Sequence, residues 1–169
     1  ISLAKITFLK TMTGFFSAEC VRRLVLWLFL FTLPAAVQAQ FRYITNDSTI
    51  TITGYHGLGG AVNIPSTIAG RPVTRLGNSA FLDDTHLTSV TIPNSVTTIE
   101  DGVFWGCTGL TRVTIGNGVT SIGDYAFRDC TGLNAIEVEV LNQAFSSLDG
   151  VLFNKDRTTL LQYPEGKGG

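Results

Sequence analysis

A 23-residue repeat in the middle of the chain limits the possible folds more than any other feature of the sequence. Residues 87–109 and 110–132 align without a gap and are identical at 14 of 23 positions. A stretched earlier copy begins near Val62 with a five-residue insertion at residues 68–72, and a later copy begins at Leu133 before departing from the pattern. Self-similarity at a fixed period of this length indicates a repeat architecture, in which each unit is one supersecondary element.

Each unit contains two short extended segments followed by a turn. In residues 87–109, Val90 and Ile92 alternate with polar residues, which predicts a short strand with one buried face. Residues 96–99 form a second extended piece, whose apolar ends face a different wall of the coil. The following residues, 101–104, are expected to form one turn of helix at most.

A single unit of this size cannot bury its apolar edge, so the units must stack. Stacking places the parallel strands about 4.8 Å apart and joins the apolar positions into ladders. The sequence therefore predicts a β-rich α/β solenoid of about four 23-residue units. The regular repeats occupy residues 62–132, and residues 133–169 form an irregular last repeat.

Two sets of residues are assigned structural roles from their recurrence. Aromatic residues recur on the core side of the predicted helical turn: Phe81, Phe104 and Phe127. Asx residues precede that turn in all three units: Asn78, Asp101 and Asp124. An Asx side chain in this position can accept the first N–H groups of the turn, so we interpret these residues as N-caps. A catalytic role is disfavoured because no acid–base partner accompanies them.

Cys107 and Cys130 hold equivalent positions in adjacent units, three residues after a core phenylalanine. Adjacent rungs bring their Cα atoms to about 5 Å, which a disulfide allows, and export would permit oxidation. Equivalent side chains in a ladder point the same way, which favours buried thiols that act as small hydrophobes. The sequence therefore leaves both a disulfide and two free thiols possible, and it favours the thiols.

The two ends of the repeat region each predict a β-hairpin. Residues 41–53 alternate around a turn at Asn46 and Asp47, so residues 40–61 are assigned to an N-terminal cap for the open edge of the first repeat. Residues 149–163 predict a second hairpin within the irregular last repeat.

Residues 1–39 differ sharply from the rest of the chain. They include 25 apolar residues, and their four basic residues and one acidic residue, Glu19, give a net charge of +3. Residues 40–169 have 8 basic and 12 acidic residues, so their net charge is −4. A basic pair precedes a ten-residue apolar core, and small residues lead to Ala39. This pattern predicts a signal peptide that is cleaved after Ala39, with Met12, the only methionine, as the true start. The core is shorter than the ~20 residues that a membrane-spanning helix needs, so no stable span is expected after cleavage.

The remaining composition excludes several classes of function. A mildly acidic body with scattered basic residues lacks the electrostatic footprint of a nucleic-acid binder. His56 and His86 stand in separate turns without a second ligand-type residue at metal-site spacing. We therefore predict no catalytic residue, no metal site and no cofactor, and expect that the chain is not an enzyme.

The repeat resembles the BspA-like class of bacterial leucine-rich repeats, which occurs in exported surface proteins. The resemblance covers roughly residues 41–164 and rests on these motif positions: Leu87, Val90, Ile92, Pro93, Val96, Ile99, Phe104 and Cys107, then Leu110, Val113, Ile115, Val119, Ile122, Phe127 and Cys130. It implies a leucine-rich-repeat fold and a role in binding or adhesion at cell surfaces, without enzyme activity. Gly116 replaces the motif proline, and Asp84 replaces the first cysteine. In that family, further repeats commonly follow a hairpin such as residues 149–163, so we expect a truncated array.

The outward-facing strand positions, together with one exposed aromatic residue, form the candidate binding face: Thr88, Ser89, Thr91, Trp105, Thr111, Arg112, Thr114 and Glu137. Small polar groups with one arginine can contact a protein or a glycan, although an ordinary solvated sheet face has the same composition. Trp105 is either a contact anchor or the cover of a neighbouring turn.

Two functions are compatible with these features. The first is an exported, non-enzymatic module, secreted or at the cell surface, that binds a protein or glycan ligand. The alternative is a structural spacer within a larger surface protein or enzyme whose activity lies elsewhere. Ice binding through stacked threonines is disfavoured because the ladder breaks at Asn63 and Glu137.

Signal-peptide cleavage provides the first test. When the chain is expressed with its leader in a secreting bacterial host, N-terminal sequencing of the exported protein is expected to begin at Gln40. Substitution of Ala39 and Val37 by bulky charged residues should block this cleavage, because the cut requires small residues at those positions. A protein that keeps residues 1–39 after export would contradict the assignment.

Overall fold

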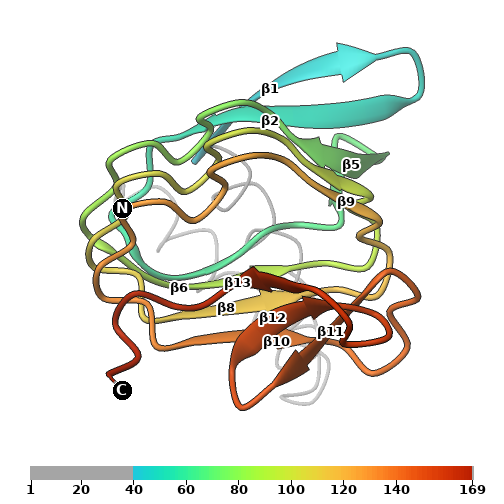
Figure 1. Cartoon of the computed structure of the whole chain (residues 1–169). Coiled ribbons are helices and arrows are strands. Elements are labelled where there is room, and N and C mark those ends of the chain that lie inside the picture. Colours follow the sequence, from blue (N-terminus) through green and yellow to red (C-terminus); the bar gives the residue numbers. More distant parts are fainter. Residues whose placement is uncertain (1–39, 169) are drawn as a thin grey trace, which may run out of the picture. The chain divides into compact units, whose positions relative to one another are not determined.

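The computed structural model describes residues 40–168, and these residues form thirteen strands and no helix. The predicted signal peptide, its cleavage site after Ala39 and the start at Met12 lie outside the described residues. Within them, no helix is long and apolar enough to cross a bilayer. The expected β-rich solenoid is confirmed: successive coils are stacked, so that strands distant in sequence lie side by side (Figure 1).

One side of the solenoid is a parallel four-stranded sheet, here called the strand wall. Its strands, in spatial order, are β3 (Gly60–Asn63), β6 (Leu87–Ile92), β8 (Arg112–Ile115) and β10 (Ala135–Val138). Val90 is paired with Val113 and Ile92 with Ile115, which is the 23-residue register that the repeat predicts. These side chains are buried, because alternate residues of each strand face the core.

A second sheet, here called the second wall, combines the N-terminal hairpin with the second extended piece of each repeat. Its strands are β1 (Phe41–Asn46), β2 (Thr49–Tyr55), β5 (Arg71–Leu76), β7 (Thr98–Ile99) and β9 (Ser121–Ile122), with β4 (Thr67–Ile68) paired to β5. The five-residue insertion at 68–72 therefore folds into a tight hairpin. Ala69 and Gly70 both have positive φ, as a two-residue hairpin turn requires, so the extra residues leave the path of the coil unchanged.

The third side, here called the turn wall, consists of residues 77–84, 100–107 and 123–130. The prediction of a helical turn in these segments is wrong. Residues with left-handed φ recur there every 23 positions, at Ser79, Gly102 and Tyr125 and again at Asp83, Gly106 and Asp129. A helix cannot continue through such residues. In the first two coils their N–H groups instead donate to carbonyls of the next coil, as in Ser79 N to Asp101 O (3.1 Å).

The Asx residues are therefore not N-caps, because no helical turn is present for them to cap. Each Asx side chain instead accepts a hydrogen bond from the equivalent backbone N–H of the next coil. Asp101 N donates to Asn78 Oδ1 (3.1 Å) and Asp124 N donates to Asp101 Oδ1 (2.9 Å). The three residues form a ladder that holds neighbouring coils in register.

An aromatic ladder runs through the core behind the turn wall, as predicted. Phe81, Phe104 and Phe127 are all buried, with ring centroids 5.1 and 5.7 Å apart. At the N-terminal end the ring of Tyr55 continues the ladder, 5.3 Å from Phe81, and Phe41 packs beside both. The predicted N-terminal hairpin thus caps the first repeat, since β2 also pairs in parallel with β5.

The C-terminal segment covers the outer edge of the strand wall. Its sheet contains β11 (Phe145–Leu148), β12 (Val151–Asn154) and β13 (Leu160–Gln162), so the predicted hairpin of β12 and β13 has a third strand that the sequence pattern did not indicate. The free N–H groups of β10 are satisfied by this segment: Ile136 N donates to Gly150 O (2.8 Å) and Val138 N to Ser147 Oγ (3.0 Å).

Asn142 joins this C-terminal segment to the last complete coil. Its side chain is fully buried, and its Nδ2 donates to Gly116 O (2.9 Å) and Val119 O (3.0 Å). Its Oδ1 accepts the N–H groups of Ala144 and Phe145, both at 2.8 Å. One side chain thereby satisfies four backbone groups at the point where the chain leaves the regular path.

The Asn142→Ala substitution is expected to lower the free energy of unfolding by about 3 kcal/mol or more, because it leaves several buried backbone groups without partners. Urea denaturation of the purified chain measures this. The control is Asn134→Ala: Asn134 is exposed and donates one side-chain hydrogen bond, to Gly132 O, so its loss should cost less than about 1 kcal/mol. Equal effects of the two substitutions would contradict the capping role of Asn142.

Candidate binding face

The outward side of the strand wall carries two rows of side chains. One row contains Ala61, Ser89, Arg112 and Ala135, and the other contains Asn63, Thr91, Thr114 and Glu137. Neighbouring members of a row belong to strands about 4.8 Å apart. The structure thus brings together five predicted face residues: Ser89, Thr91, Arg112, Thr114 and Glu137.

Thr88 and Thr111 lie at the side of this face. Both are exposed, as predicted, but their polar groups take part in the stacking of coils. The N–H and the hydroxyl of Thr111 both donate to Thr88 O, at 2.8 and 2.9 Å. Their first role is therefore to link adjacent coils, which leaves the two rows as the part of the face with unused polar groups.

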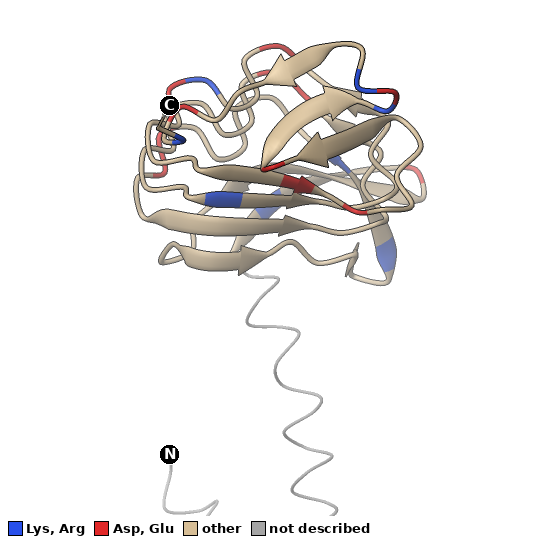
Figure 2. Cartoon of the chain, turned by 60° about the horizontal axis from the view of Figure 1, so that its bottom comes forward, with Lys and Arg blue, Asp and Glu red and all other residues tan. Residues whose placement is uncertain are grey.

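Arg112 and Glu137 form an ion pair across the two rows, and each side chain is about half exposed, at 54% and 51%. An exposed ion pair of this kind contributes little to stability, so either group can exchange its partner for a ligand group at small cost. Figure 2 shows the charged residues of the body scattered rather than gathered into one patch. The strand wall therefore offers a mixed polar surface instead of a strongly charged one.

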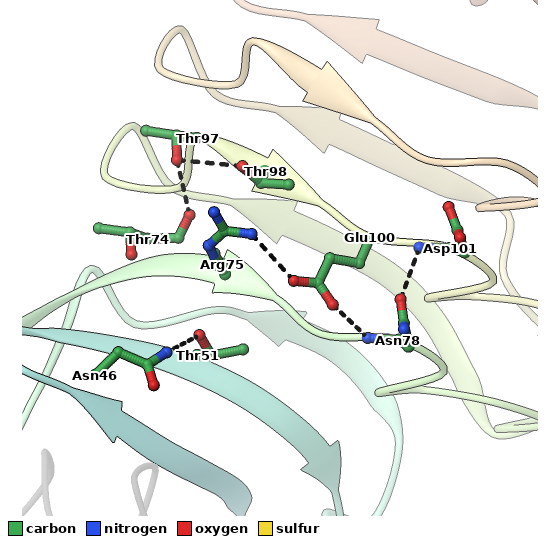
Figure 3. Close-up of polar contacts among 9 residues, drawn as sticks. All are labelled: Asn46, Thr51, Thr74, Arg75, Asn78, Thr97, Thr98, Glu100 and Asp101. Atoms are coloured by element: carbon green, nitrogen blue, oxygen red, sulfur yellow. Dashed lines mark hydrogen bonds and ion pairs between the residues drawn. The ribbon is translucent and has the colours of Figure 1, made fainter.

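The second wall and the adjoining start of the turn wall carry a comparable set of polar contacts, drawn in Figure 3. Arg75 Nη1 lies 3.2 Å from Glu100 Oε1, and Glu100 Oε2 accepts the N–H of Asn78 (3.1 Å). Thr97 donates its hydroxyl to Thr74 O (3.1 Å). These contacts connect neighbouring coils, so this wall provides a matched comparison for the strand wall.

Trp105 does not lie on the strand wall, contrary to its inclusion in the candidate face. It belongs to the turn wall, because it lies in the segment that leads from β7 back to β8. Its indole N–H donates to Asp129 Oδ2 (2.8 Å), and 37% of the residue is exposed. Arg128 Cζ lies 5.1 Å from the ring centroids of both Trp105 and Tyr125.

Trp105 therefore covers a neighbouring turn, which was the alternative given for it. Sequence reasoning missed its partners Tyr125, Arg128 and Asp129. The repeat itself contains the signal that could have found them, since Arg128 is the equivalent of Trp105 one unit later and must stack beside it.

Cys107 and Cys130 are free thiols and both are fully buried, which decides between the two states that the sequence left open. Each thiol also donates to a phenylalanine carbonyl of the preceding coil: Cys107 Sγ to Phe81 O (2.9 Å) and Cys130 Sγ to Phe104 O (3.0 Å). Burial raises the pKa of each thiol to about 12, because the thiolate would lose its hydration. They remain protonated, unreactive parts of the core at neutral pH.

Among residues 40–168, no group of three or more His, Cys, Asp or Glu side chains could hold a metal ion. His56 and His86 are exposed. The polar rows of the strand wall are thus the surface with the clearest capacity to bind a ligand, through hydrogen bonds from hydroxyl, amide and guanidinium groups.

Comparison with known proteins identifies the repeat. The sequence model of the BspA type leucine rich repeat region matches residues 38–163 in six copies. Among solved structures, the chain is similar to a leucine-rich repeat protein from Bacteroides ovatus, with 25% identity over 62% of this chain and 29% of that chain, and a TM-score of 0.54. The expected leucine-rich-repeat fold is therefore confirmed.

Two further structures show sequence similarity. The leucine rich repeat protein of T. pallidum is 27% identical over 58% of this chain and 68% of that chain, with a TM-score of 0.42. A leucine rich cell surface protein from Faecalibacterium prausnitzii is 20% identical over 74% of this chain and 60% of that chain, with a TM-score of 0.42. The chain spans less than two thirds of the length of the B. ovatus and F. prausnitzii proteins. No protein of curated function matches the chain.

The raised pKa values of the buried thiols lead to a pH dependence of stability. Above pH 9 the thiols ionise in the unfolded chain but keep their protons in the folded chain until about pH 12. The unfolded state then binds fewer protons, so the free energy of unfolding should fall by about 1.4 kcal/mol per thiol for each pH unit in this range. Urea denaturation at pH 8.5 and pH 10 measures this loss.

The double variant Cys107→Ala/Cys130→Ala is the control, because it retains every tyrosine, lysine and arginine. Between the two pH values its free energy of unfolding should fall less than that of the unaltered chain. The difference between the two decreases should be about 3 kcal/mol, which is the contribution of both thiols together. The same pH dependence in both proteins would show that the thiols do not cause it.

Proposed function

Because the chain belongs to the BspA-type leucine-rich-repeat family, we propose that it is an exported, non-enzymatic module that binds a protein or glycan ligand at the cell surface. The strand wall is the proposed contact surface. The observation that carries the proposal is the pair of polar rows across four parallel strands, whose polar members are exposed or half-buried.

The rows suit an extended ligand for two physical reasons. The sheet is rigid, because each strand between the edges is hydrogen-bonded on both sides, so the side chains are held at a fixed spacing before a ligand arrives. Preorganisation of this kind lowers the entropic cost of binding. Ser89, Thr91 and Thr114 are short side chains with little rotamer freedom to lose, and their hydroxyls both donate and accept hydrogen bonds.

The F. prausnitzii relative is described as a cell surface protein, which agrees with the proposed location. Together with the predicted signal peptide, it supports an assignment to the surface or the secreted fraction. The absence of a strong charge patch also favours a neutral or mixed-charge ligand over a polyanion.

A spacer role is the second candidate. It is favoured by the match to the B. ovatus protein, which covers 29% of that chain, so a comparable array forms only part of a longer protein. In this role the solenoid would set a distance between other parts of a larger surface protein or enzyme, and its strand wall would bind nothing.

Ligand screening with matched variants distinguishes the two candidates. The full chain is first screened against a glycan array and a panel of extracellular matrix proteins. For a ligand found there, Arg112→Ala/Glu137→Ala is expected to weaken binding at least tenfold, since it removes the charged pair without leaving a single uncompensated charge.

The control is Arg75→Ala/Glu100→Ala, which removes the corresponding pair where the second wall meets the turn wall and should change the affinity less than twofold. A larger effect of the control variant would move the contact surface to the second wall. Uniformly negative screens would contradict the binding proposal and support the spacer role.

A further inference from the structure

The N-terminal hairpin caps the first coil, but its own outer strand is open on one side. β1 stands at one end of the second wall and pairs only with β2 among residues 40–168. With six residues it is the longest strand at a sheet edge in this part of the chain. Figure 1 shows it at the outer end of the stacked coils. An edge of this length presents backbone groups with which a further strand can pair.

The register of the hairpin shows which backbone groups these are. In a two-residue hairpin the residues that flank the turn, here Asn46 and Thr49, form a hydrogen-bonded pair, and the pairs alternate along the strands. The N–H and C=O of Ile44 therefore point towards β2. Those of Tyr43 and Thr45 point away from it, so two donors and two acceptors lie on the open edge.

β1 lacks the features that commonly protect the edge of a sheet. It contains no proline and no lysine. Its pairing with β2 has one bulge between Arg42 and Tyr43, but the extra residue, Thr53, belongs to β2. A bulge interrupts the strand that carries the extra residue, so β1 itself alternates regularly. The edge is therefore open to pairing along the length of the strand.

The side chains of β1 are exposed together with its backbone. All five residues at positions 42–46 are exposed, and the exposed fractions of Tyr43 and Ile44 are 39% and 52%. Tyr43 pairs with the buried Ile52 and so lies on the core face of the hairpin, whereas its neighbour Ile44 lies on the opposite face. Each face of the strand thus carries one large apolar side chain in contact with solvent.

A second copy of β1 fits this edge when the two strands run antiparallel about a two-fold axis at Ile44. In that register Tyr43 of each copy lies opposite Thr45 of the other, and the outward groups form four backbone hydrogen bonds. Ile44 lies opposite its equivalent in a non-hydrogen-bonded pair, where facing side chains approach most closely. Two half-exposed apolar side chains thereby cover each other.

The polar side chains match in the same register, because Arg42 of each copy lies opposite Asn46 of the other. The Nδ2 of Asn46 donates to Thr51 Oγ1 (3.0 Å), and its Oδ1 accepts no hydrogen bond from residues 40–168. Arg42 forms no ion pair within the same residues. Asp47, next to Asn46, adds a negative charge beside the guanidinium group. A donor therefore meets an acceptor at both ends of the paired strands.

These matches favour a second copy over other occupants. An unrelated strand can satisfy the four backbone groups, but it does not supply an acceptor for Arg42, a donor for Asn46 and an apolar partner for Ile44 at the same spacing. A coil of this repeat is a poor occupant, because coils pair in parallel whereas β1 is antiparallel to β2. Residues 1–39, which precede the hairpin, contain no copy of the repeat.

We propose that the open edge of β1 is a self-association surface, at which two copies of this chain pair antiparallel and join their second walls into one continuous sheet. The contact is distinct from the strand wall and does not rest on the function proposed for it. One short strand per copy gives an interface below roughly 1,200 Å², so the dimer is weak and forms only at high concentration.

Sedimentation velocity of the purified chain provides the direct test. A monomer is expected at about 10 µM and a dimer at about 1 mM, as for other small interfaces. Hydrogen exchange of the Tyr43 and Thr45 amides should slow at least twofold at the higher concentration, because both become hydrogen-bonded. The amide of Ile44 is the internal control, since it already bonds to β2 and its exchange should not change. A monomer at both concentrations would overturn the proposal.

A pair of substitutions at one position tests the backbone pairing. Thr45→Pro removes one donor from each copy and leaves the hairpin intact, since the N–H of Thr45 points away from β2. It should weaken dimerisation at least tenfold, because two of the four hydrogen bonds are lost. Thr45→Val keeps the N–H and should change the dimerisation constant less than threefold. An unaltered urea midpoint of Thr45→Pro at about 10 µM shows that the monomer is still folded.

Disulfide trapping tests the register, in a Cys20→Ser background with the buried Cys107 and Cys130 retained. Ile44→Cys should form a covalent dimer when oxidised glutathione is added, because the paired Cα atoms lie about 4.5 Å apart. Thr49→Cys is the matched control on the same face of the hairpin. Its equivalents are separated by three strand spacings, about 14 Å, which is too far for a disulfide. Equal trapping at the two positions, or equal dimerisation of the two Thr45 variants, would overturn the proposal.

Discussion

Hydrogen bonds between successive coils are the constraint on which the rest of this structure depends. On all three walls, backbone groups of the regular repeats pair with the neighbouring coil at an offset of 22 to 24 residues, as in Thr97 N to Thr74 O and Gly102 N to Asp124 O. An added residue must therefore be accommodated locally, as a bulge or a side hairpin, so that the pairing of the following residues is kept. The insertion at residues 68–72 is tolerated because it folds back as a tight hairpin, with Ile68 buried in the core. The same spacing forces equivalent side chains into contact, which produces the aromatic, thiol and Asx ladders.

Such a solenoid must also satisfy its two ends, and this chain treats them differently. The first coil is covered by a β-hairpin and by Tyr55, which extends the aromatic ladder by one ring. At the other end the strand wall is covered by the sheet of β11, β12 and β13, and Asn142 satisfies the corner where the chain leaves the coil. Within residues 40–168 the turn wall is only partly covered, because Glu165 satisfies one of its three outer donors. On the turn wall this asymmetry follows from backbone polarity, since N–H groups there face the next coil and carbonyls face the preceding one, as in Ser79 N to Asp101 O.

Positions inside the ladders are committed to stacking, so only outward side chains are free to differ between repeats. On the strand wall these are the members of two rows, where Arg112 faces Glu137 across adjacent strands. On the turn wall the variable position holds Trp105 in one coil and Arg128 in the next, and the two stack on each other. Ligand specificity in this architecture is therefore confined to a few positions per coil, while the remaining residues maintain the period. The proposed contact surface on the strand wall uses groups that the stacking leaves available.

The sequence by itself determined the period, the strand register and the buried ladders. A 23-residue repeat with fixed apolar positions buries all of them only when successive units stack in register. It also located both terminal hairpins. It did not determine the conformation between Asp101 and Phe104, where local preference favours a helical turn. The structure has left-handed residues there, since the N–H groups bond to the next coil rather than within the turn. Nor did it place Trp105 away from the strand wall or bring Glu165 to the N–H of Asp129. Those features depend on which coil lies beside which, and on where the chain leaves the stack, and only the tertiary structure decides either.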